Sequence, residues 1–500
     1  MQIFPLSRQL YRAKQLGHPA KLVRAQLLGR PTKIVRAQQP GHSAKIVRTQ
    51  LLGRPKKIVR PEQRGRPAKR WINQMARLVG FAPRPSSNDI TMNQTESLAC
   101  ENGAEALPAV DLSGRTKEPG GSRWCITAQF LCWVIASIIG SSSGAAWAET
   151  WNVGPSFDFK TPSEIAGWAN DGDTILIEAG RYQGDVAVWR QSNLTLKALD
   201  GAVVLDAAGR SAEDKAIWVV NGNNVTVDGI EFRNAAVRDR NGAGIRAQGR
   251  NLTIKNSVFA FNENGILTVD DDQSNITIVN SRFISNGHGD GYSHGLYIGD
   301  VNRFIFQHNY VYGTQVGHHV KSRANSNDIS YNFLIDGRHG TASYAVDLPD
   351  ADAARLVGNI MHQGQGTENY HFVNFEPNSA DAELILVNNT VVNEFDSGVF
   401  LRLGGDANTT ILNNILAGAI DAKGAGEAGN IRLTLSDFVN SQAYDFRLRP
   451  GSKAIDAGIA LPTVHNRPIA PEFEYRHPAH AAVRVRNRSI DAGAFEFQAE

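Results

Sequence analysis

Cysteine is scarce in this chain, and its distribution limits the chemistry of most of the sequence. The 500 residues include three cysteines, and all of them precede residue 149: Cys100, Cys125 and Cys132. Residues 149–500 therefore have no disulfide, no thiol nucleophile and no thiolate metal site. Any chemistry in that part must use oxygen and nitrogen groups.

Charge of either sign is unevenly distributed along the chain. Residues 1–148 hold 23 Lys and Arg against 7 Asp and Glu, whereas residues 149–500 hold 29 against 42. The overall net charge of +3 thus hides a basic segment followed by an acidic one. An acidic segment repels polyanions at long range, although screening over about 8 Å at physiological salt permits a local basic groove.

The basic segment is built from a repeated unit of twelve residues, such as GHPAKLVRAQLL. A glycine opens each copy: Gly17, Gly29, Gly41, Gly53 and Gly65. Twelve residues do not fill a whole number of helical turns, so the apolar pairs form no stripe, and Gly-x-Pro interrupts regular structure. We expect residues 1–70 to be disordered and residues 71–122 to be a linker.

Two interpretations of these repeats stay open. They could form a cationic arm for nucleic acid or another anionic polymer. Alternatively, a tandem DNA repeat upstream of the true start has been translated. The export signal predicted downstream favours the second interpretation, because such a signal belongs at the beginning of a chain.

The export signal is predicted at residues 123–148. Residues 124–140 are an uncharged, mostly apolar run behind Arg123, and residues 146–148 read Ala-Trp-Ala, the pattern of a cleavage site. The run is shorter than the roughly 20 apolar residues that span a membrane, so an uncleaved anchor is the less favoured alternative. We expect cleavage after Ala148, a secreted or periplasmic protein and no stable membrane anchor.

Residues 149–500 repeat a short strand-like motif at intervals of mostly 24 to 31 residues. Copies of the motif are NLTL at 193, NVTVDGIEF at 224, NLTIKNSVF at 251, NITIVNSRF at 275, NRFIFQHNYV at 302, NDISYNFL at 327, ARLVGNIM at 354, ELILVNNTVV at 383 and NTTILNNILA at 408. Each copy alternates apolar and polar residues with β-branched types, which predicts a half-buried strand. A second strand-like piece lies between copies. Several short strands per unit, without helices, predict a solenoid of about nine or more stacked coils.

Asparagines recur at the turn after each strand. We expect these side chains to stack, each amide bonding to the coils above and below: Asn256, Asn280, Asn309, Asn332, Asn359, Asn389 and Asn414.

Over residues 150–497 the sequence resembles the pectate-lyase-like right-handed parallel β-helix proteins. GDTILIEAGRY at 172 resembles their opening strand, and DFRLRPGSKAIDAG at 445 with IDAGAFEF at 490 resembles their closing coil. The blocks KAIWVVNGNNVTVDGIEF, GHHVKSRA and SYAVDLPD look like a bacterial secreted group of unknown activity. The resemblance implies an all-β, single-stranded right-handed parallel β-helix over residues 149–500. The fold hosts lyases, hydrolases, epimerases and binders, so function must be argued from the site.

A candidate site follows from aligning the second strands by their inward aliphatic residues. The alignment places three residues in one interior column: Leu296, Val320 and Val346. Tyr297, Lys321 and Asp347 then project outward from three consecutive coils. Other polar and aromatic residues fall around them: His294, His318, His319, Arg323, Tyr344 and Arg402.

These residue types match the needs of β-elimination in a uronate polymer. The site must neutralise the carboxylate, remove the adjacent proton and protonate the leaving oxygen. Arg323 can grip a carboxylate through its planar fork, and Lys321 is the candidate base. Tyr297 or Tyr344 can return the proton.

Five further residues complete the predicted site. His318 or His319 could replace the base or the acid, and His294, Asp347 and Arg402 are predicted to bind substrate. Lyases of the resembled family use a Lys or Arg base with a cation that neutralises the uronate, sometimes calcium. Their WIDH and RxPxxR motifs are missing here, which removes pectate as the favoured substrate. The predicted partner is an acidic polysaccharide, with no nucleic acid for residues 149–500, and the protein is expected to be a monomer.

A polygalacturonase-like hydrolase is one alternative. Three aspartates, Asp270, Asp271 and Asp272, precede His294, Lys321 and Arg323 in an order that loosely resembles such hydrolases. The Asn-Thr-Asp motif is absent, and an inverting hydrolase needs two carboxylates roughly 6.5–9.5 Å apart. The aspartates could instead form a solvated turn or a calcium ligand set, so Ca²⁺ is the one cofactor considered.

Other functions are compatible with the same residues. A uronate C-5 epimerase shares the proton abstraction step with elimination. A non-catalytic surface protein could bind glycans through Tyr297, Tyr344, Tyr370 and Trp189. Finally, the charged residues could be a surface ion-pair ladder of purely structural value.

Overall fold

The computed structural model describes residues 147–422 and 428–499. The basic repeats, the linker and the export signal precede residue 147, apart from Trp147 and Ala148, so these predictions lie outside the described residues. In the described ranges, no helix is long and apolar enough to cross a membrane. The one α-helix in these ranges is α4 (Pro162–Ile165), and strands make up most of the rest.

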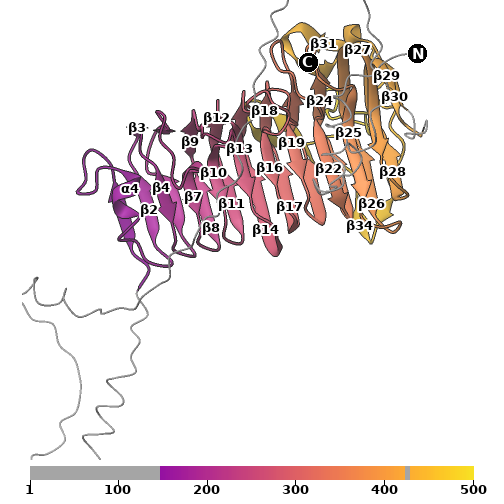
Figure 1. Ribbon diagram of the computed structural model, residues 1–500. Helices are drawn as coiled ribbons and strands as arrows, with labels where there is room; N and C mark the ends of the chain where they lie inside the picture. Colours follow the sequence, from indigo (N-terminus) through magenta and orange to yellow (C-terminus); the bar gives the residue numbers. More distant parts are fainter. Residues whose placement is uncertain (1–146, 423–427, 500) are drawn as a thin grey trace, which may run out of the picture. The chain divides into compact units, whose positions relative to one another are not determined.

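The strands wind into a parallel β-helix, because the alternating segments of each repeat pair in register with those of the next (Figure 1). The predicted parallel β-helix is therefore confirmed. The first strand of each coil belongs to an eleven-stranded sheet, called sheet 1 here. Its strands are β1 (Thr150–Val153), β2 (Thr174–Ile177), β5 (Thr195–Ala198), β8 (Val225–Asp228), β11 (Leu252–Lys255), β14 (Asp271–Val279), β17 (Val301–Gln307), β20 (Ser326–Ser330), β23 (Ala353–Val357), β26 (Glu383–Val387) and β28 (Asn408–Leu412).

The second strand of each coil belongs to sheet 2. Its strands are β3 (Gly180–Gln183), β6 (Val203–Asp206), β9 (Ile230–Arg233), β12 (Val258–Ala260), β15 (Arg282–Ile284), β18 (Tyr310–Tyr312), β21 (Phe333–Ile335), β24 (Ile360–Gln363), β27 (Thr390–Leu403), β29 (Ile415–Asp421) and β30 (Ile431–Leu433).

The third strand of each coil belongs to sheet 3. Its strands are β4 (Ala187–Trp189), β7 (Ala216–Val220), β10 (Ala243–Ala247), β13 (Asn264–Thr268), β16 (Leu296–Ile298), β19 (Val320–Ser322), β22 (Val346–Ala351) and β25 (His371–Pro377). The long strand β27 pairs with β24 at its start and with β25 near its end, so it joins sheets 2 and 3. Sheet 3 carries the residues predicted to form the site.

Stacked rings fill part of the interior. Phe232, Phe259 and Phe283 occupy equivalent places on β9, β12 and β15, and their ring centroids lie 5.1 and 5.0 Å apart. All three side chains are fully buried. Burying each ring contributes roughly 1.5–3 kcal/mol, so this column holds the coils together along the axis.

The asparagine ladder is confirmed for five of its seven predicted members. Successive amides of Asn309, Asn332, Asn359, Asn389 and Asn414 donate to the next amide oxygen at 3.2, 3.0, 3.0 and 3.0 Å. These side chains are buried, and each also donates to a backbone carbonyl of the preceding coil. The ladder thus fixes the register of the later coils.

The prediction was wrong for Asn256 and Asn280. Each lies one residue before the ladder position, with φ of 51° and 50°, and Ser257 and Ser281 occupy the ladder position itself. Asparagine tolerates this left-handed conformation better than most residues, so these two amides serve the turn instead of the ladder.

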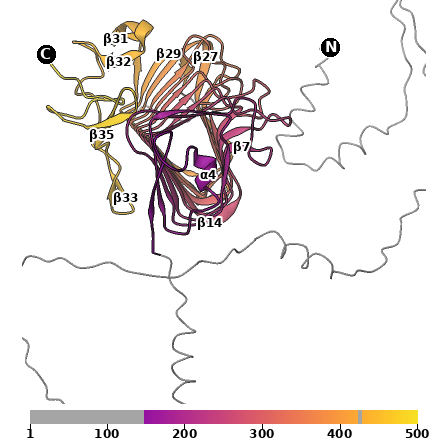
Figure 2. The same cartoon turned by 90° about the vertical axis from the view of Figure 1, so that its left-hand side faces the viewer.

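The C-terminal segment does not close the helix as a further coil, so that expectation was wrong. It forms β31 (Phe438–Asn440), β32 (Asp445–Leu448), β33 (Thr463–Val464), β34 (Arg467–Pro468), β35 (Phe473–Arg476) and β36 (His480–Val483), with 3₁₀ turns η2 (Leu435–Asp437) and η3 (Ser441–Ala443). These strands pair antiparallel, and Phe438 and Phe446 pack on Phe333 and Ile360 of sheet 2. Figure 2, viewed along the axis, shows the segment outside one side of the coils and α4 at the end of the interior. The later strands of sheet 2, from β18 onward, are therefore covered from outside.

Candidate functional site

The interior column that locates the site is present as predicted. Leu296, Val320 and Val346 pair in register on β16, β19 and β22, and all three are fully buried. Since side chains alternate along a strand, the residue that follows each one faces the outside of sheet 3.

The outer row runs over five consecutive coils. Tyr297, Lys321 and Asp347 pair in register, as predicted, and the row continues through Asn374 on β25 to Arg402 on β27. Neighbouring strands lie about 4.8 Å apart, so these five side chains are close neighbours along the axis. We call this set the outer row.

Asp347 is buried at the centre of the outer row, whereas the sequence analysis placed it in solvent. Its residue is 3% exposed because side chains from both neighbouring coils cover it. One oxygen accepts a hydrogen bond from Asn374 Nδ2 at 2.7 Å, and the other receives Lys321 Nζ and lies 3.2 Å from His318 Nε2. Burial alone would raise the pKa of this carboxyl, but His318 and Lys321 hold it well below its usual range.

Two histidines lie beside this carboxylate in a neutral form. His318 Nδ1 accepts the backbone N–H of Tyr344 at 3.3 Å, so the ring proton belongs on Nε2, towards Asp347. Burial lowers the pKa of His318 to about 4, with a further contribution from Lys321, although Asp347 opposes the shift. His294 Nδ1 likewise accepts the N–H of His318 at 3.1 Å, and burial lowers its pKa well below the usual range.

The aromatic rings form a continuous stack along the coils. Centroid distances are 5.9 Å from Tyr297 to His294, 4.8 Å from His294 to His318, 4.9 Å from His318 to Tyr344 and 6.1 Å from Tyr344 to His371. The row of rings therefore follows the outer row over four successive coils. His294 and His318 are buried, so the rings that reach the surface of this face are those of Tyr297, Tyr344 and His371.

The two predicted proton-transfer tyrosines have different surroundings. Tyr297 Oη accepts a hydrogen bond from Arg323 Nε at 3.1 Å, so a guanidinium faces this phenol. Tyr344 lies near Asp347 instead, and burial together with that negative charge raises its pKa. When two titratable groups of one site have different surroundings, their pKa values move apart, and one can act as an acid while the other acts as a base at the same pH.

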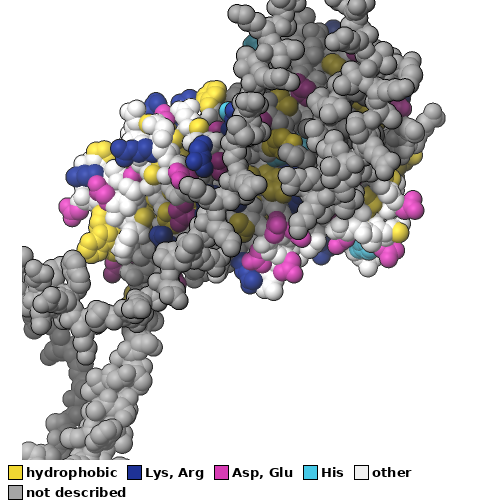
Figure 3. Space-filling model, in the orientation of Figure 1, with side chains coloured by type: hydrophobic (Ala, Val, Ile, Leu, Met, Phe, Trp, Pro, Cys, Tyr) yellow, Lys and Arg dark blue, Asp and Glu magenta, His cyan; other side chains and the backbone are white. Residues whose placement is uncertain are grey.

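Each predicted cation of the site has a carboxylate partner. Lys321 pairs with Asp347, Arg323 with Asp350, and Arg402 with Glu376. The Arg323 and Arg402 side chains are 38% and 44% exposed, so a ligand can reach both. On the part of the described surface visible in Figure 3, positive and negative side chains are also intermixed. The basic groove expected from the sequence is thus a face of paired charges.

His319 does not join the site, so its predicted role was wrong. Its Nδ1 lies 2.9 Å from Thr314 Oγ1, and its Nε2 lies 3.0 Å from Asp336 Oδ1. All three residues are buried at 1% exposure. Successive residues point to different sides of the backbone, so His318 enters the site while His319 packs against the neighbouring turn.

The three aspartates do not form the predicted metal or hydrolase site. Asp271 belongs to sheet 1 and pairs with Arg250 at 2.6 Å, and the hydrogen bond from Arg250 lowers its pKa. Asp270 accepts the backbone N–H of Asp300 at 2.9 Å, and Asp272 is exposed. Across residues 147–422 and 428–499, no group of three or more His, Cys, Asp or Glu residues is arranged to hold a metal ion.

Several site residues were missed by the sequence analysis, and one glycan-binding candidate was wrong. Trp189 is fully buried in the interior, whereas Tyr370 is 48% exposed and packs on His371 at 4.3 Å. Asn374 was missed, although extending the coil register by one further strand would have found it. Asp350 and Glu376 lie within β22 and β25, where the register between these strands shifts, so no period predicts them.

Comparisons with known proteins agree with the fold. Residues 209–334 match a family model described as a right handed beta helix region. The crystal structure of pectate lyase Pel9A is similar to the chain at 16% identity and a TM-score of 0.46, over 71% of this chain and 98% of that chain. A search of the curated proteins found no match. The family match confirms the predicted right-handed parallel β-helix and leaves the activity to be argued from the outer row.

Proposed function

We propose that the protein is a carbohydrate-active enzyme that cleaves a uronate-containing polysaccharide by β-elimination on the outer face of sheet 3. One observation carries the proposal: Tyr297 and Tyr344, in unlike electrostatic surroundings, flank Lys321 within three coils. Elimination needs a proton acceptor, a proton donor and a cation for the uronate, and this face holds all three.

Tyr297 is assigned as the base. Tyr297 acts as a base in its phenolate form, after its own proton has left to solvent. Its oxygen accepts a hydrogen bond from Arg323, whose positive charge stabilises that phenolate until it takes the proton of the substrate and becomes a phenol. The histidines are less suited, because His318 and His294 each use Nδ1 as an acceptor and carry the proton on Nε2. Neither ring therefore offers a vacant lone pair.

Lys321 is assigned to substrate binding and not to proton abstraction. Its ammonium donates to the ionised carboxylate of Asp347, so in this geometry it is a charged group. A charged ammonium that is 16% exposed can bind the uronate carboxylate and so stabilise the carbanion next to it. Asp347 positions the ammonium and is itself held by His318 and Asn374.

Tyr344 is assigned as the acid. Burial and the nearby Asp347 raise the pKa of its phenol, so the phenol stays protonated at neutral pH. A protonated phenol can donate to the glycosidic oxygen as the bond breaks. The proton taken by Tyr297 and the proton given by Tyr344 then leave the substrate balanced.

The polymer would run parallel to the axis of the coils. The coils repeat about every 4.8 Å along the axis, so successive sugars can contact equivalent positions on successive coils. The partly exposed rings of Tyr297, Tyr344 and His371 follow the same direction and can contact the sugar rings. An exported monomer without nucleic acid or membrane partner is part of the proposal.

The test is to incubate the full chain with alginate, polygalacturonate, hyaluronan and heparosan and to follow the ultraviolet absorbance of unsaturated uronate products. One polymer should give product, and Lys321→Ala should abolish it. The matched control is Lys255→Ala, because Lys255 ends β11 in sheet 1, away from the outer row. Product formation that survives Lys321→Ala would contradict the assignment.

Non-catalytic glycan binding is the second candidate, and the paired charges favour it. Since Lys321, Arg323 and Arg402 are all neutralised by neighbouring carboxylates, the face could bind sugars through its rings without reacting. Binding of a polymer that leaves its absorbance and chain length unchanged would support this candidate over elimination.

A further inference from the structure

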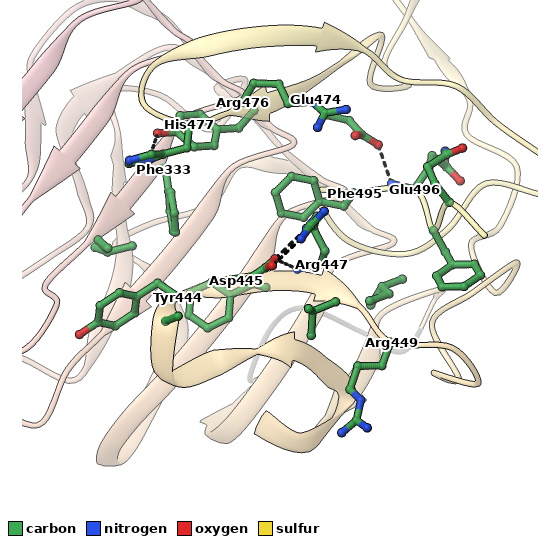
Figure 4. Close-up of a pocket in the computed structure, with 18 of the residues that line it drawn as sticks. Phe333, Tyr444, Asp445, Arg447, Arg449, Glu474, Arg476, His477, Phe495 and Glu496 are labelled. Carbon is green, nitrogen blue, oxygen red and sulfur yellow. Dashed lines mark hydrogen bonds and ion pairs between the residues drawn. The ribbon is translucent and has the colours of Figure 1, made fainter. Parts of the chain in front are cut away.

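A cavity lies between sheet 2 and the C-terminal segment, and none of the outer-row residues lines it. Its volume is about 1430 Å³, above the roughly 300–1,000 Å³ of a typical small-molecule pocket. Residues of β18, β21, β32 and β35 line it together with residues 495–499. Figure 4 shows Phe333, Tyr444, Arg476 and Phe495 around this space. The cavity is thus large enough for a chain of several sugar units.

Aromatic rings form much of the lining. Tyr310 and Phe333 lie on adjacent strands of sheet 2 with centroids 5.8 Å apart, and Tyr475 of β35 packs on Phe333 at 5.2 Å. Phe446 lines the cavity from the C-terminal segment, as does Phe495 (Figure 4). Phe333, Phe446 and Tyr475 are buried and form the floor of the lining. The partly exposed rings of Tyr310, Tyr444 and Phe495 can pack on the apolar faces of sugar rings.

Three arginines lie in or next to this cavity, and they differ from Arg323 and Arg402 of the candidate site in their lack of a carboxylate partner in the described part of the chain. Arg449 and Arg476 line it, and Arg282 lies beside Tyr310 in the register of sheet 2. None of the three forms an ion pair with a carboxylate among the described residues, although Arg449 donates to a backbone carbonyl. Together with burial, the charge of Arg282 lowers the pKa of His477, which also lines the cavity.

The acidic residues of the cavity are engaged within the protein. Asp445 pairs with Arg447, and Glu496 pairs with the buried Arg484 at 2.8 Å. Glu474 accepts the backbone N–H of Glu496 at 2.6 Å, and burial raises the pKa of Glu474. The groups left for a ligand are therefore rings and guanidinium groups.

We infer that this cavity is a second binding site, for an acidic oligosaccharide whose carboxylates pair with Arg449 and Arg476 and whose rings pack on the aromatic lining. A uronate sugar combines an apolar ring face with a carboxylate, which matches a lining of both kinds. The inference rests on the proposed function only for the identity of the sugar, because the cavity is built from sheet 2 and not from the outer row.

The experiment is calorimetric titration of the full chain carrying Tyr297→Phe, which prevents cleavage of the probe. Tetragalacturonate and a mannuronate tetrasaccharide are the probes, and cellotetraose is the uncharged control. At least one acidic probe should bind at two sites, more weakly as sodium chloride is raised. Adding Arg449→Ala and Arg476→Ala should weaken one site at least tenfold, whereas Arg486→Ala, at an exposed arginine outside the cavity, should change nothing.

The inference is overturned if the cavity variant and Arg486→Ala give the same isotherms, if neither acidic probe binds, or if cellotetraose binds as tightly as the acidic probes. Circular dichroism of each variant checks folding, and Arg476→Gln replaces the alanine variant if that one unfolds. A chain that makes no unsaturated product but still binds through Arg449 and Arg476 would refute the proposed function and leave this inference intact. If the unaltered chain cleaves the polymer but the cavity variant binds as before, the proposed function stands and this inference is refuted.

Discussion

Replacing Asp347 by Asn tests whether the outer row is held by a buried charge. The carboxylate receives Lys321, His318 and Asn374, and the asparagine can still accept from Asn374 but carries no charge. The Lys321 ammonium, 16% exposed, then loses its partner. Removing one member of a buried ion pair costs roughly 3–5 kcal/mol, and partial access of Lys321 to water places this case at about 3 kcal/mol.

Urea unfolding followed by circular dichroism measures this cost. With a slope of about 3 kcal/mol per molar urea, the midpoint should fall by about 1 M. The control is Asp272→Asn, because Asp272 is exposed on the same chain and has no ion pair among the described residues. Adding Lys321→Met to Asp347→Asn should recover part of the loss, since it removes the unpaired ammonium. Equal midpoints for Asp347→Asn and Asp272→Asn would refute the reasoning.

Three further predictions follow from buried groups. His318 is neutral in the folded protein, whereas in the unfolded chain it protonates near its ordinary pKa. The free energy of unfolding should therefore be at its full value above pH 6.5 and fall by about 3 kcal/mol as the pH drops to about 4. Urea titrations at both pH values should show a smaller loss for His318→Asn. Asn389→Ala removes the side-chain partner of two buried backbone groups of the preceding coil, the N–H of Asn359 and the carbonyl of Leu356, and should cost about 3 kcal/mol in urea unfolding, against under about 1 kcal/mol for the exposed Asn302→Ala. Tyr344→Phe should slow product formation at least roughly 100-fold with an unchanged thermal midpoint, and an unchanged rate would remove Tyr344 as the acid.

The repeat explains why the coil register was predictable from sequence. Side chains alternate with a period of two and the coils have similar lengths, so aligning Leu296, Val320 and Val346 fixed the neighbours Tyr297 and Lys321. One residue of slip would have moved every side chain to the other face. Local pattern and fold agree here, and the prediction succeeded for that reason.

The burial of Asp347 could not be read from the same pattern. Alternation gives the side of the strand but not what covers that side, and the cover comes from His318 and Asn374 on neighbouring coils. The error at Asn256 has a related origin. Asparagine suits both the left-handed turn and the ladder position one residue later, and pairs such as Asn388 and Asn389 fill both, so residue type alone does not separate them.

The C-terminal segment was the part least accessible to sequence reasoning. Its contacts with the coils join residues about 100 apart, such as the hydrogen bonds from Asn388 Nδ2 to the carbonyls of Asp491 and Gly493 at 2.8 and 3.1 Å. No period relates those residues. The cavity between sheet 2 and this segment was therefore invisible until the fold was known.

The most direct test of the central claim compares the rate of unsaturated product formation by Tyr297→Phe with that of the unaltered full chain. Loss of one phenolic oxygen should lower the rate by roughly 100- to 10,000-fold, because Tyr297 is the assigned base. Tyr182→Phe, which removes a phenol at the first coils, should keep the full rate. A Tyr297→Phe protein that folds and cleaves as fast as the unaltered chain would contradict the account.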